Sequence, residues 1–355
     1  MIFYSLLLLS SMTLVCFSKF IEKRLGVYLC VVVFIILGAI ASLRGYVGTD
    51  TYSYHIQFEQ INTQENYDAM TFLNEPAFVA IAEFVKFTGG NSFAYVSFIG
   101  ILQTLLVIFI LRKIERPALF LMFYIATFYL EFHFNIIRES TSTLLILISL
   151  LGIREGGPKF FIPLLSSILF HYTAIFVVAY VLIYKQFLEN KYIYAALLLL
   201  LLSAVIYEVV TVFYDLLYIK YKFYLEEDMG VEQKLGIGVL LKLCLYIGLA
   251  ITLLKRSPLD IIFFVLPLVL IKLLMVNYPI VGRAESFILP ILILILTKDA
   301  EKGWRRELSR VCFVALSILN VYGVIYTISN ENLQPLDFEH SMSPYIPYHT
   351  LLEVK

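Results

Sequence analysis

Long, uninterrupted apolar runs separated by short polar segments set the pattern of this chain. Most of the runs are close to the roughly 17–25 residues that a helix needs to cross a bilayer core of about 30 Å. We therefore predict an all-α, polytopic helical membrane protein. The runs lie at residues 2–18, 26–43, 92–111, 117–134, 137–153, 159–184, 192–213, 235–254, 259–276, 281–297 and 311–328.

The run at 159–184 differs from the others because polar residues interrupt its centre. Basic residues flank both of its ends, and His171-Tyr172-Thr173 lies in the middle. Short cytoplasmic loops of membrane proteins carry the excess of lysine and arginine, so both flanks are cytoplasmic only if the run turns back. We predict a hairpin of two short helices with His171 at its outer tip. The alternative is one long tilted span with His171 buried inside it.

The distribution of lysine and arginine orients the predicted spans. Six basic groups between the runs are assigned to the cytoplasmic side, which gives about twelve spans with both termini outside. The external segments then include a loop at 44–91 and the C-terminal tail at 330–355. Within that loop, residues 76–87 are too few for a span and predict an amphipathic helix at the membrane interface. We expect a single integral membrane domain over residues 1–355. The six groups lie at 19–24, 112–116, 154–159, 185–191, 255–256 and 298–310.

Composition agrees with this class and excludes others. Hydrophobic residues make up 60% of the chain and charged residues 15%, which a soluble domain of 355 residues does not tolerate. The formal net charge is zero, so nothing indicates nucleic acid as a partner. No histidine or cysteine has the spacing of metal ligands, and we expect neither a metal nor a cofactor. A carboxylate site for a divalent cation at Asp50 and Glu75 is the weaker alternative.

Three arginines lie at or just within the predicted outer ends of apolar helices, namely Arg44, Arg138 and Arg283. Such residues are costly against lipid, so they usually face a water-filled interior or a partner. Arginine binds phosphate through a planar, bidentate fork, and three guanidinium groups on one side favour an anionic ligand. The alternative for each arginine is that it reaches the headgroups or pairs with a neighbour such as Glu139 or Glu285.

Ordered motifs along the chain give it a resemblance to a known family. An arginine, a Gly-x-Asp and a tyrosine follow the second run, an Ile-Arg step opens the fifth, and a Phe-His-x-Thr-Ala step falls at the predicted hairpin tip. A late Arg-x-x-x-aromatic segment and terminal Pro-Tyr pairs complete the set. In this sequence they are Arg44, Gly48, Asp50 and Tyr54; Ile137-Arg138-Glu139-Ser140; Phe170-His171-Tyr172-Thr173-Ala174; Arg283 and Phe287; and Pro344-Tyr345 or Pro347-Tyr348. On these motifs the chain resembles the EpsG/Wzy-type polysaccharide polymerases of bacterial envelopes, although the family often has Gln where this chain has Glu139.

The resemblance implies a GT-C-like glycosyltransferase in the bacterial cytoplasmic membrane, with its active site facing the exterior. Its substrate would be undecaprenyl-diphosphate-linked oligosaccharide, taken from the lipid, and a chain-length regulator protein is a further partner that the family implies. The product would be O-antigen, capsule or exopolysaccharide. The alternatives are a flippase or other transporter of the same lipid-linked sugar, an envelope ligase, or a related glycosyltransferase. Clustering of the charges on one side counts against a transporter, which needs them along a whole path.

The implied chemistry assigns expected roles to the candidate residues. Arg44, Arg138 and Arg283 are expected to bind the diphosphate, since cations must stabilise the departing group. His171 and Asp50 are the candidates for activating the acceptor hydroxyl, because a histidine side chain titrates near neutral pH and Asp50 follows a flexible turn. Between these two, we expect His171 to act in catalysis and Asp50 to organise Arg44 and the loop. The sugar is expected to contact Tyr54, Glu75, Tyr345 and Tyr348.

Overall fold

A computed structural model describes most of the chain, and the regular structure in the described part is entirely helical. The prediction of an all-α fold is therefore confirmed for these residues. The chain divides into two compact units, which are described separately, and the expectation of a single domain stays a prediction. The described residues are 2–48, 50–61, 75–192, 237–253, 258–274 and 284–298, with 314–320 and the positions 282, 308, 311, 312 and 322.

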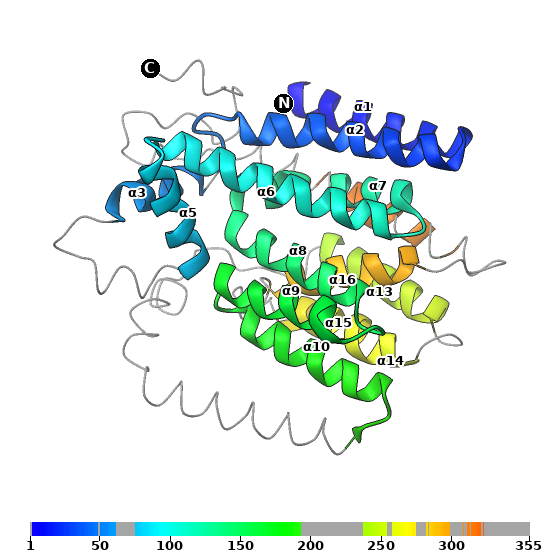
Figure 1. Ribbon diagram of the computed structural model, residues 1–355. Helices are drawn as coiled ribbons and strands as arrows, with labels where there is room; N and C mark the ends of the chain where they lie inside the picture. Colours follow the sequence, from blue (N-terminus) through cyan, green and yellow to red (C-terminus); the bar gives the residue numbers. More distant parts are fainter. Residues whose placement is uncertain are drawn as a thin grey trace. The chain divides into compact units, whose positions relative to one another are not determined.

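The first unit contains the helices from the N-terminus to residue 170 (Figure 1). Helix α2 packs against α6, α1 against α2 and α7, and α8 against α9. Small residues bring α2 and α6 close together, because a side chain at Gly100 would meet Ser42. The elements are α1 (Ile2–Phe17), η1 (Ser18–Phe20), α2 (Lys23–Ser42), α3 (Thr51–Gln60), α5 (Pro76–Phe87), α6 (Ser92–Lys113), α7 (Pro117–Thr127), η2 (Glu131–Asn135), α8 (Ile137–Leu151) and α9 (Gly157–Phe170).

Among the described residues, two helices are long and apolar enough to cross a membrane, α2 and α6. Both carry a stripe of large apolar side chains on the surface away from their buried face. On α2 the stripe includes Val32, Ile35 and Ile36, each about half exposed, and α6 exposes Ile101 and Leu105 in the same way. Exposed apolar stripes of this kind are typical of lipid contact. The count of about twelve spans stays a prediction.

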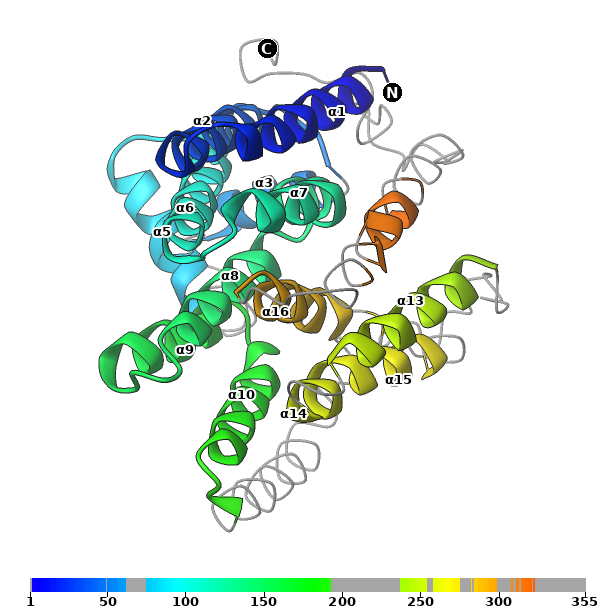
Figure 2. The ribbon, with the colours of Figure 1, turned by 90° about the vertical axis from the view of Figure 1, so that its right-hand side faces the viewer.

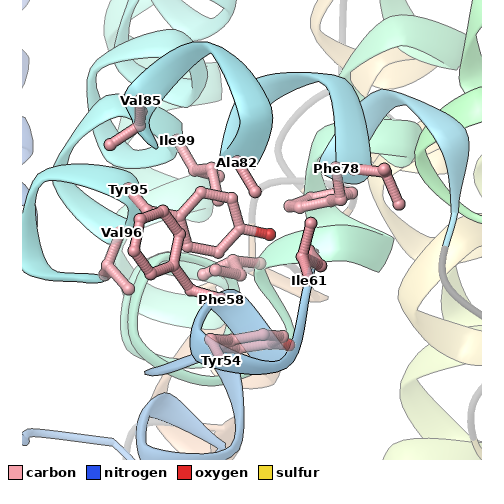
Figure 3. Packing of buried hydrophobic residues seen from close by; sticks show 11 residues of the cluster. Tyr54, Phe58, Ile61, Phe78, Ala82, Val85, Tyr95, Val96 and Ile99 are labelled. Atoms are coloured by element: carbon pink, nitrogen blue, oxygen red, sulfur yellow. The ribbon is translucent and has the colours of Figure 1, made fainter. Parts of the chain in front are cut away.

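The helix predicted at 76–87 is present as α5, with the bounds that the pattern indicated, and its location at the membrane interface stays a prediction. Four of its residues are buried against α3 and α6, at the spacing of one helical face: Phe78, Val79, Ala82 and Val85. They belong to a cluster that also contains Tyr54 and Tyr95 (Figure 3). The segment between α2 and α6 therefore has its own apolar packing, which holds α3 and α5 in place.

The expected span at 117–134 differs in the structure. Helix α7 ends at Thr127, and residues Glu131–Asn135 form the π-helical turn η2. Buried side chains of the neighbouring helices donate hydrogen bonds to a backbone carbonyl of this irregular turn. Gln103 Nε2 donates to the carbonyl of Phe132 at 3.5 Å, and Ser140 Oγ donates to the same carbonyl at 3.0 Å. Such polar support is needed wherever the backbone departs from a regular helix in an apolar environment.

The turn between α2 and α3 docks onto η2 through a glycine. Gly48 has a φ of +113°, and a side chain at this position would collide with the carbonyl of Phe134. Thr51 Oγ1 donates to the same carbonyl at 3.1 Å. Positive φ favours glycine because it has no Cβ, so this contact depends on the residue type.

The second unit contains most of α10 (Ala174–Leu188) with α13 (Ile237–Leu253), α14 (Pro258–Asp260), η3 (Ile261–Val265), α15 (Leu266–Leu274) and the first half of α16 (Glu285–Lys298) (Figure 2). The Tyr184 hydroxyl donates to Asp260 at 2.6 Å, and Phe263 packs against the same ring. The predicted break in the run at 159–184 is confirmed, since α9 ends at Phe170 and α10 begins at Ala174. Whether these two helices return side by side stays a prediction.

Candidate active site

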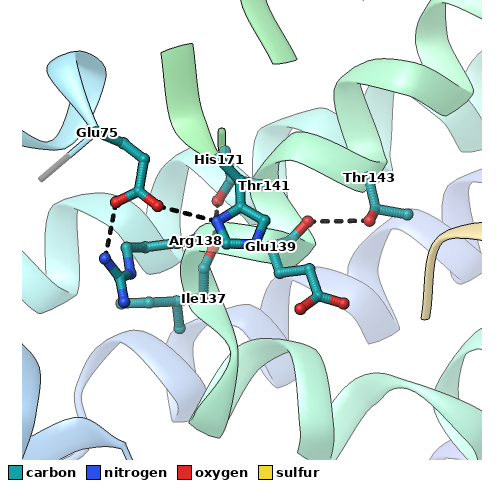
Figure 4. Close-up of polar contacts among 7 residues, drawn as sticks. All are labelled: Glu75, Ile137, Arg138, Glu139, Thr141, Thr143 and His171. Carbon is teal, nitrogen blue, oxygen red and sulfur yellow. Dashed lines mark hydrogen bonds and ion pairs between the residues drawn. The ribbon is translucent and has the colours of Figure 1, made fainter. Parts of the chain in front are cut away.

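Glu75 joins two of the candidate residues through its two carboxylate oxygens (Figure 4). Arg138 Nη1 donates to Oε2 of Glu75 at 2.7 Å. On the other side, His171 Nδ1 lies 3.0 Å from Oε1 of Glu75. Three segments that are distant in the sequence therefore meet at one buried carboxylate, whose side chain is only 3% exposed.

Helix ends place all three residues. Glu75 immediately precedes α5, whose first residue is Pro76, and its side chain makes no capping bond with that helix. Arg138 lies in the first turn of α8, and His171 follows the last residue of α9 in an extended conformation. The His171 backbone N–H donates to the carbonyl of Ser167 at 3.1 Å, and its own carbonyl accepts from Ala174 at 3.0 Å. The imidazole thus projects from a rigidly bonded turn.

Tyr54 from α3 supports the guanidinium group of Arg138. The central guanidinium carbon lies 5.6 Å from the centre of the Tyr54 ring, a cation–π distance. Tyr54 itself is 3% exposed. Burial raises the pKa of Tyr54 far above its ordinary value, although the charge of Arg138 acts in the opposite direction. Tyr54 is therefore a neutral phenol whose ring packs against the guanidinium group of Arg138. The structure places Tyr54 in the buried apolar cluster with α5 and α6.

Glu75 is ionised in this environment. Burial alone raises the pKa of its carboxyl group, but the hydrogen bond from His171 and the charge of Arg138 outweigh that effect, so the pKa lies below its usual range. An ionised carboxylate only accepts hydrogen bonds, so Nδ1 of His171 carries the proton that is shared with Glu75. In the neutral imidazole, Nε2 is then the nitrogen that can accept a proton.

Arg138 and His171 are more accessible than the carboxylate between them. The side chains of Arg138 and His171 are 26% and 16% exposed, against 3% for Glu75. The arrangement thus offers a cation and a proton acceptor at a partly open surface, with the negative charge behind them. It fits a reaction in which a hydroxyl is deprotonated near a departing anion.

The side chain of Arg44 is buried inside the protein. The residue is 1% exposed, and Nη1 donates to the carbonyls of Ala41 at 2.7 Å and His133 at 2.6 Å. Its guanidinium carbon lies 5.3 Å from the centre of the Phe134 ring. These contacts join the C-terminal end of α2 to η2, which favours a structural role over the expected contact with diphosphate.

Asp50 is positioned directly before α3, partly buried, and makes no capping bond with that helix. Its charge reaches Tyr54 one turn along, where it helps to raise the pKa of the phenol. Three expected site residues lie outside the described part of the chain: Arg283, Tyr345 and Tyr348. Among the described residues, no cluster of three or more histidines, cysteines or carboxylates is arranged to hold a metal ion.

Sequence reasoning missed two features of this molecule. Glu75 was expected to contact sugar, whereas the structure gives it both Arg138 and His171 as partners. An acidic residue directly before a helix-opening proline was the available signal. The second feature is a buried ion pair in the second unit, where Lys272 bonds Glu285 and the Tyr246 hydroxyl donates to Glu285 at 2.6 Å.

The described residues define an all-helical protein with two helices that are able to cross a membrane and a buried carboxylate joined to an arginine and a histidine. The model of the EpsG family matches residues 27–350, nearly the whole chain, and the protein belongs to this family of Wzy-type polysaccharide polymerases. The family expected from the sequence motifs is therefore confirmed. No significant match was found among curated proteins or among solved structures.

Proposed function

We propose that this protein joins undecaprenyl-diphosphate-linked oligosaccharide units into a surface polysaccharide at the outer face of the bacterial cytoplasmic membrane. The observation that carries the proposal is the meeting of His171 and Arg138 on Glu75. One reaction needs both groups: a base for the acceptor hydroxyl and a cation for the departing diphosphate. Membership of the EpsG family supports the same reaction class.

In the proposed reaction, His171 Nε2 accepts the proton of an acceptor sugar hydroxyl. The hydroxyl oxygen attacks the anomeric carbon of the growing chain, and the bond from that carbon to the diphosphate oxygen breaks. Undecaprenyl diphosphate leaves with the bonding electrons, and Arg138 stabilises its added negative charge. The proton then passes from His171 to water, which restores the site.

Replacement of His171 provides the test. His171→Ala should leave single repeat units and lower the rate of chain growth by about 10²-fold or more, the usual worth of a general base. Lys159→Ala is the matched control, since Lys159 lies on α9, the helix that His171 follows, with a side chain that is 76% exposed. The readouts are polysaccharide gels and protein level in the membrane. Long chains from His171→Ala at normal protein level would remove His171 from the reaction.

Purified protein in lipid vesicles separates the proposed activity from its alternatives. Undecaprenyl-diphosphate-linked repeat units are supplied as the only substrate. A polymerase forms longer chains and releases undecaprenyl diphosphate, whereas a flippase only moves the substrate between leaflets. A ligase transfers the supplied glycan only to an added lipid acceptor and forms no longer chains. Vesicles that contain folded protein and substrate but form no longer chains would contradict the proposal.

A further inference from the structure

Glu75 is bonded to both groups that the proposed reaction uses for different tasks. Its Oε2 accepts from Arg138 and its Oε1 from His171. If Arg138 binds the diphosphate of the donor, it must do so while it is held by a competing anion inside the protein. In the structure, the Glu75 carboxylate therefore occupies part of the anion-binding edge of Arg138.

We propose that the donor diphosphate displaces Glu75 from Arg138 and that Glu75 then acts on His171 alone, so that donor binding activates the base. This inference rests on the proposed function. It makes Glu75 a positioning residue that acts through its two neighbours and does not touch the substrate.

The geometry of Arg138 supports the exchange. A guanidinium group carries five N–H donors in a fixed plane, and the bond to Glu75 engages Nη1. About a quarter of the Arg138 side-chain surface is exposed, and the Tyr54 ring holds the guanidinium group from another side. A phosphate can therefore approach the accessible part of Arg138 before the bond to Glu75 is lost, and the ring keeps the guanidinium group in place during the change.

Charge balance gives the exchange its consequence for His171. In the structure, the charge of Glu75 is compensated by Arg138. Once Arg138 faces phosphate, a carboxylate that is 3% exposed lacks its strong cation, and a buried charge without a partner is unfavourable. Protonation of His171 restores the balance, because an imidazolium ion bonded to a carboxylate is stabilised. The site then favours the charge state that forms when His171 takes the acceptor proton.

The atoms of the step balance without any change in Glu75. The acceptor oxygen gains the anomeric carbon and loses its proton to His171 Nε2, and the diphosphate oxygen takes the electrons of the broken bond. Glu75 stays ionised and keeps its bond to Nδ1 throughout. After undecaprenyl diphosphate departs, His171 releases its proton to water and Arg138 returns to Glu75.

Glu75→Gln tests the exchange, because the amide keeps the size of the side chain but removes its charge. We expect this variant to bind undecaprenyl diphosphate several-fold more tightly than the unaltered protein, since Arg138 no longer has a competing anion. Its rate of chain growth at saturating donor should fall by at least tenfold, since the imidazolium ion is no longer stabilised. Glu155→Gln is the matched control: Glu155 forms an exposed pair with Lys159, and both readouts should be unchanged.

Two results would overturn the inference. One is weaker binding of undecaprenyl diphosphate by Glu75→Gln, and the other is an unchanged rate of chain growth. If unaltered protein neither binds undecaprenyl diphosphate nor forms chains, the proposed function itself fails and the inference fails with it. If it does both and only the Glu75 results differ from expectation, the inference alone fails.

A measurement on the unaltered protein covers the case in which Glu75→Gln does not fold. The full chain, with nitrogen-15 in its histidines, is titrated in nanodiscs, and the signal of His171 is assigned by its loss in His171→Gln. Addition of undecaprenyl diphosphate should move the protonation midpoint of His171 to higher pH. An unchanged midpoint, or a shift to lower pH, would show that donor binding does not activate the base.

Discussion

His171 Nδ1 lies 3.0 Å from Oε1 of Glu75, although 96 positions separate the two residues in the sequence. The pair fixes which imidazole nitrogen carries a proton, because an ionised carboxylate accepts but does not donate. The accessible chemistry of His171 is thus set by a residue in the loop between α2 and α6. Through this contact, Glu75 makes the loop at 44–91 a part of the candidate active site.

Arg138→Lys should lose most of the chain growth, about tenfold or more, while the protein still inserts in the membrane. Lysine keeps the positive charge but not the planar fork that matches two phosphate oxygens. The rate of polymer formation in membranes with equal amounts of protein is the measurement. Arg154→Lys, at an exposed position in a different segment, is the control and should be fully active. Normal chain length from Arg138→Lys would rule out bidentate binding of the diphosphate by this residue.

Protonation of His55 should make the protein less stable as the pH falls from about 6.5 toward about 4. Burial, together with the charge of Arg44, lowers the pKa of His55 to about 4, whereas in the unfolded chain it is about 6.5. The unfolded state therefore binds more protons in this window, so acidification favours unfolding, by about 3 kcal/mol at most.

His55→Phe tests that dependence. The ring of His55 packs against Tyr46 and Phe93, with centroids 4.8 and 4.4 Å away, so a phenyl ring fits the surroundings. Thermal unfolding temperatures of both proteins are compared between pH 4 and 7. The variant should lose less stability than the unaltered protein over this range. If the unfolding temperatures of the two proteins fall equally with decreasing pH, His55 is not the group responsible.

Glu75 should contribute stability that is complete above about pH 5 and is lost on stronger acidification. Its pKa is lowered in the folded protein, so the contribution disappears as the pH falls through the folded value and the carboxylate becomes protonated. Below about pH 5, the unfolding temperature of Glu75→Gln should fall less with decreasing pH than that of the unaltered protein. A Glu75→Gln variant with the same acid dependence would contradict the ionised state of Glu75.

Lys272→Met should destabilise the protein by about 3–5 kcal/mol, because it leaves Glu285 with a buried charge that has lost its bonded lysine. The double variant Lys272→Met/Glu285→Gln should recover much of that loss, since the amide can still accept from the Tyr246 hydroxyl. Unfolding temperature in detergent and the level of folded protein are the measurements. A double variant no more stable than Lys272→Met would argue against the ion pair as the source of the effect.

The proposed orientation places the loop 44–91 outside and the connection between α8 and α9 inside. Thr88 and Glu155 are exposed positions in these two segments, so each can be replaced by cysteine in a protein without its native cysteines. A membrane-impermeant thiol reagent added to intact cells should label Thr88→Cys and not Glu155→Cys. The reverse result would invert the topology that the basic residues indicate.

Local features of the fold were predictable from the sequence, because they depend on neighbouring residues. The bounds of α5 and the break at His171 follow from short polar interruptions of apolar runs. The turn η2 was not predictable in this way, since Gln103 on another helix bonds the carbonyl of Phe132 within it. The pairing of Glu75 with Arg138 and His171 was not predictable either. It depends on how α5, α8 and α9 meet, which periodicity within one segment does not specify.

The contact at Gly48 gives a way to compare relatives of this protein without determining their structures. The loop docks on η2 only because no side chain stands between Gly48 and the carbonyl of Phe134. A chain with alanine or a larger residue at the matching position has to hold this turn at a greater distance from the carbonyl. Position 48 is therefore a sequence marker that separates relatives in which this turn can dock on η2 from those in which it cannot.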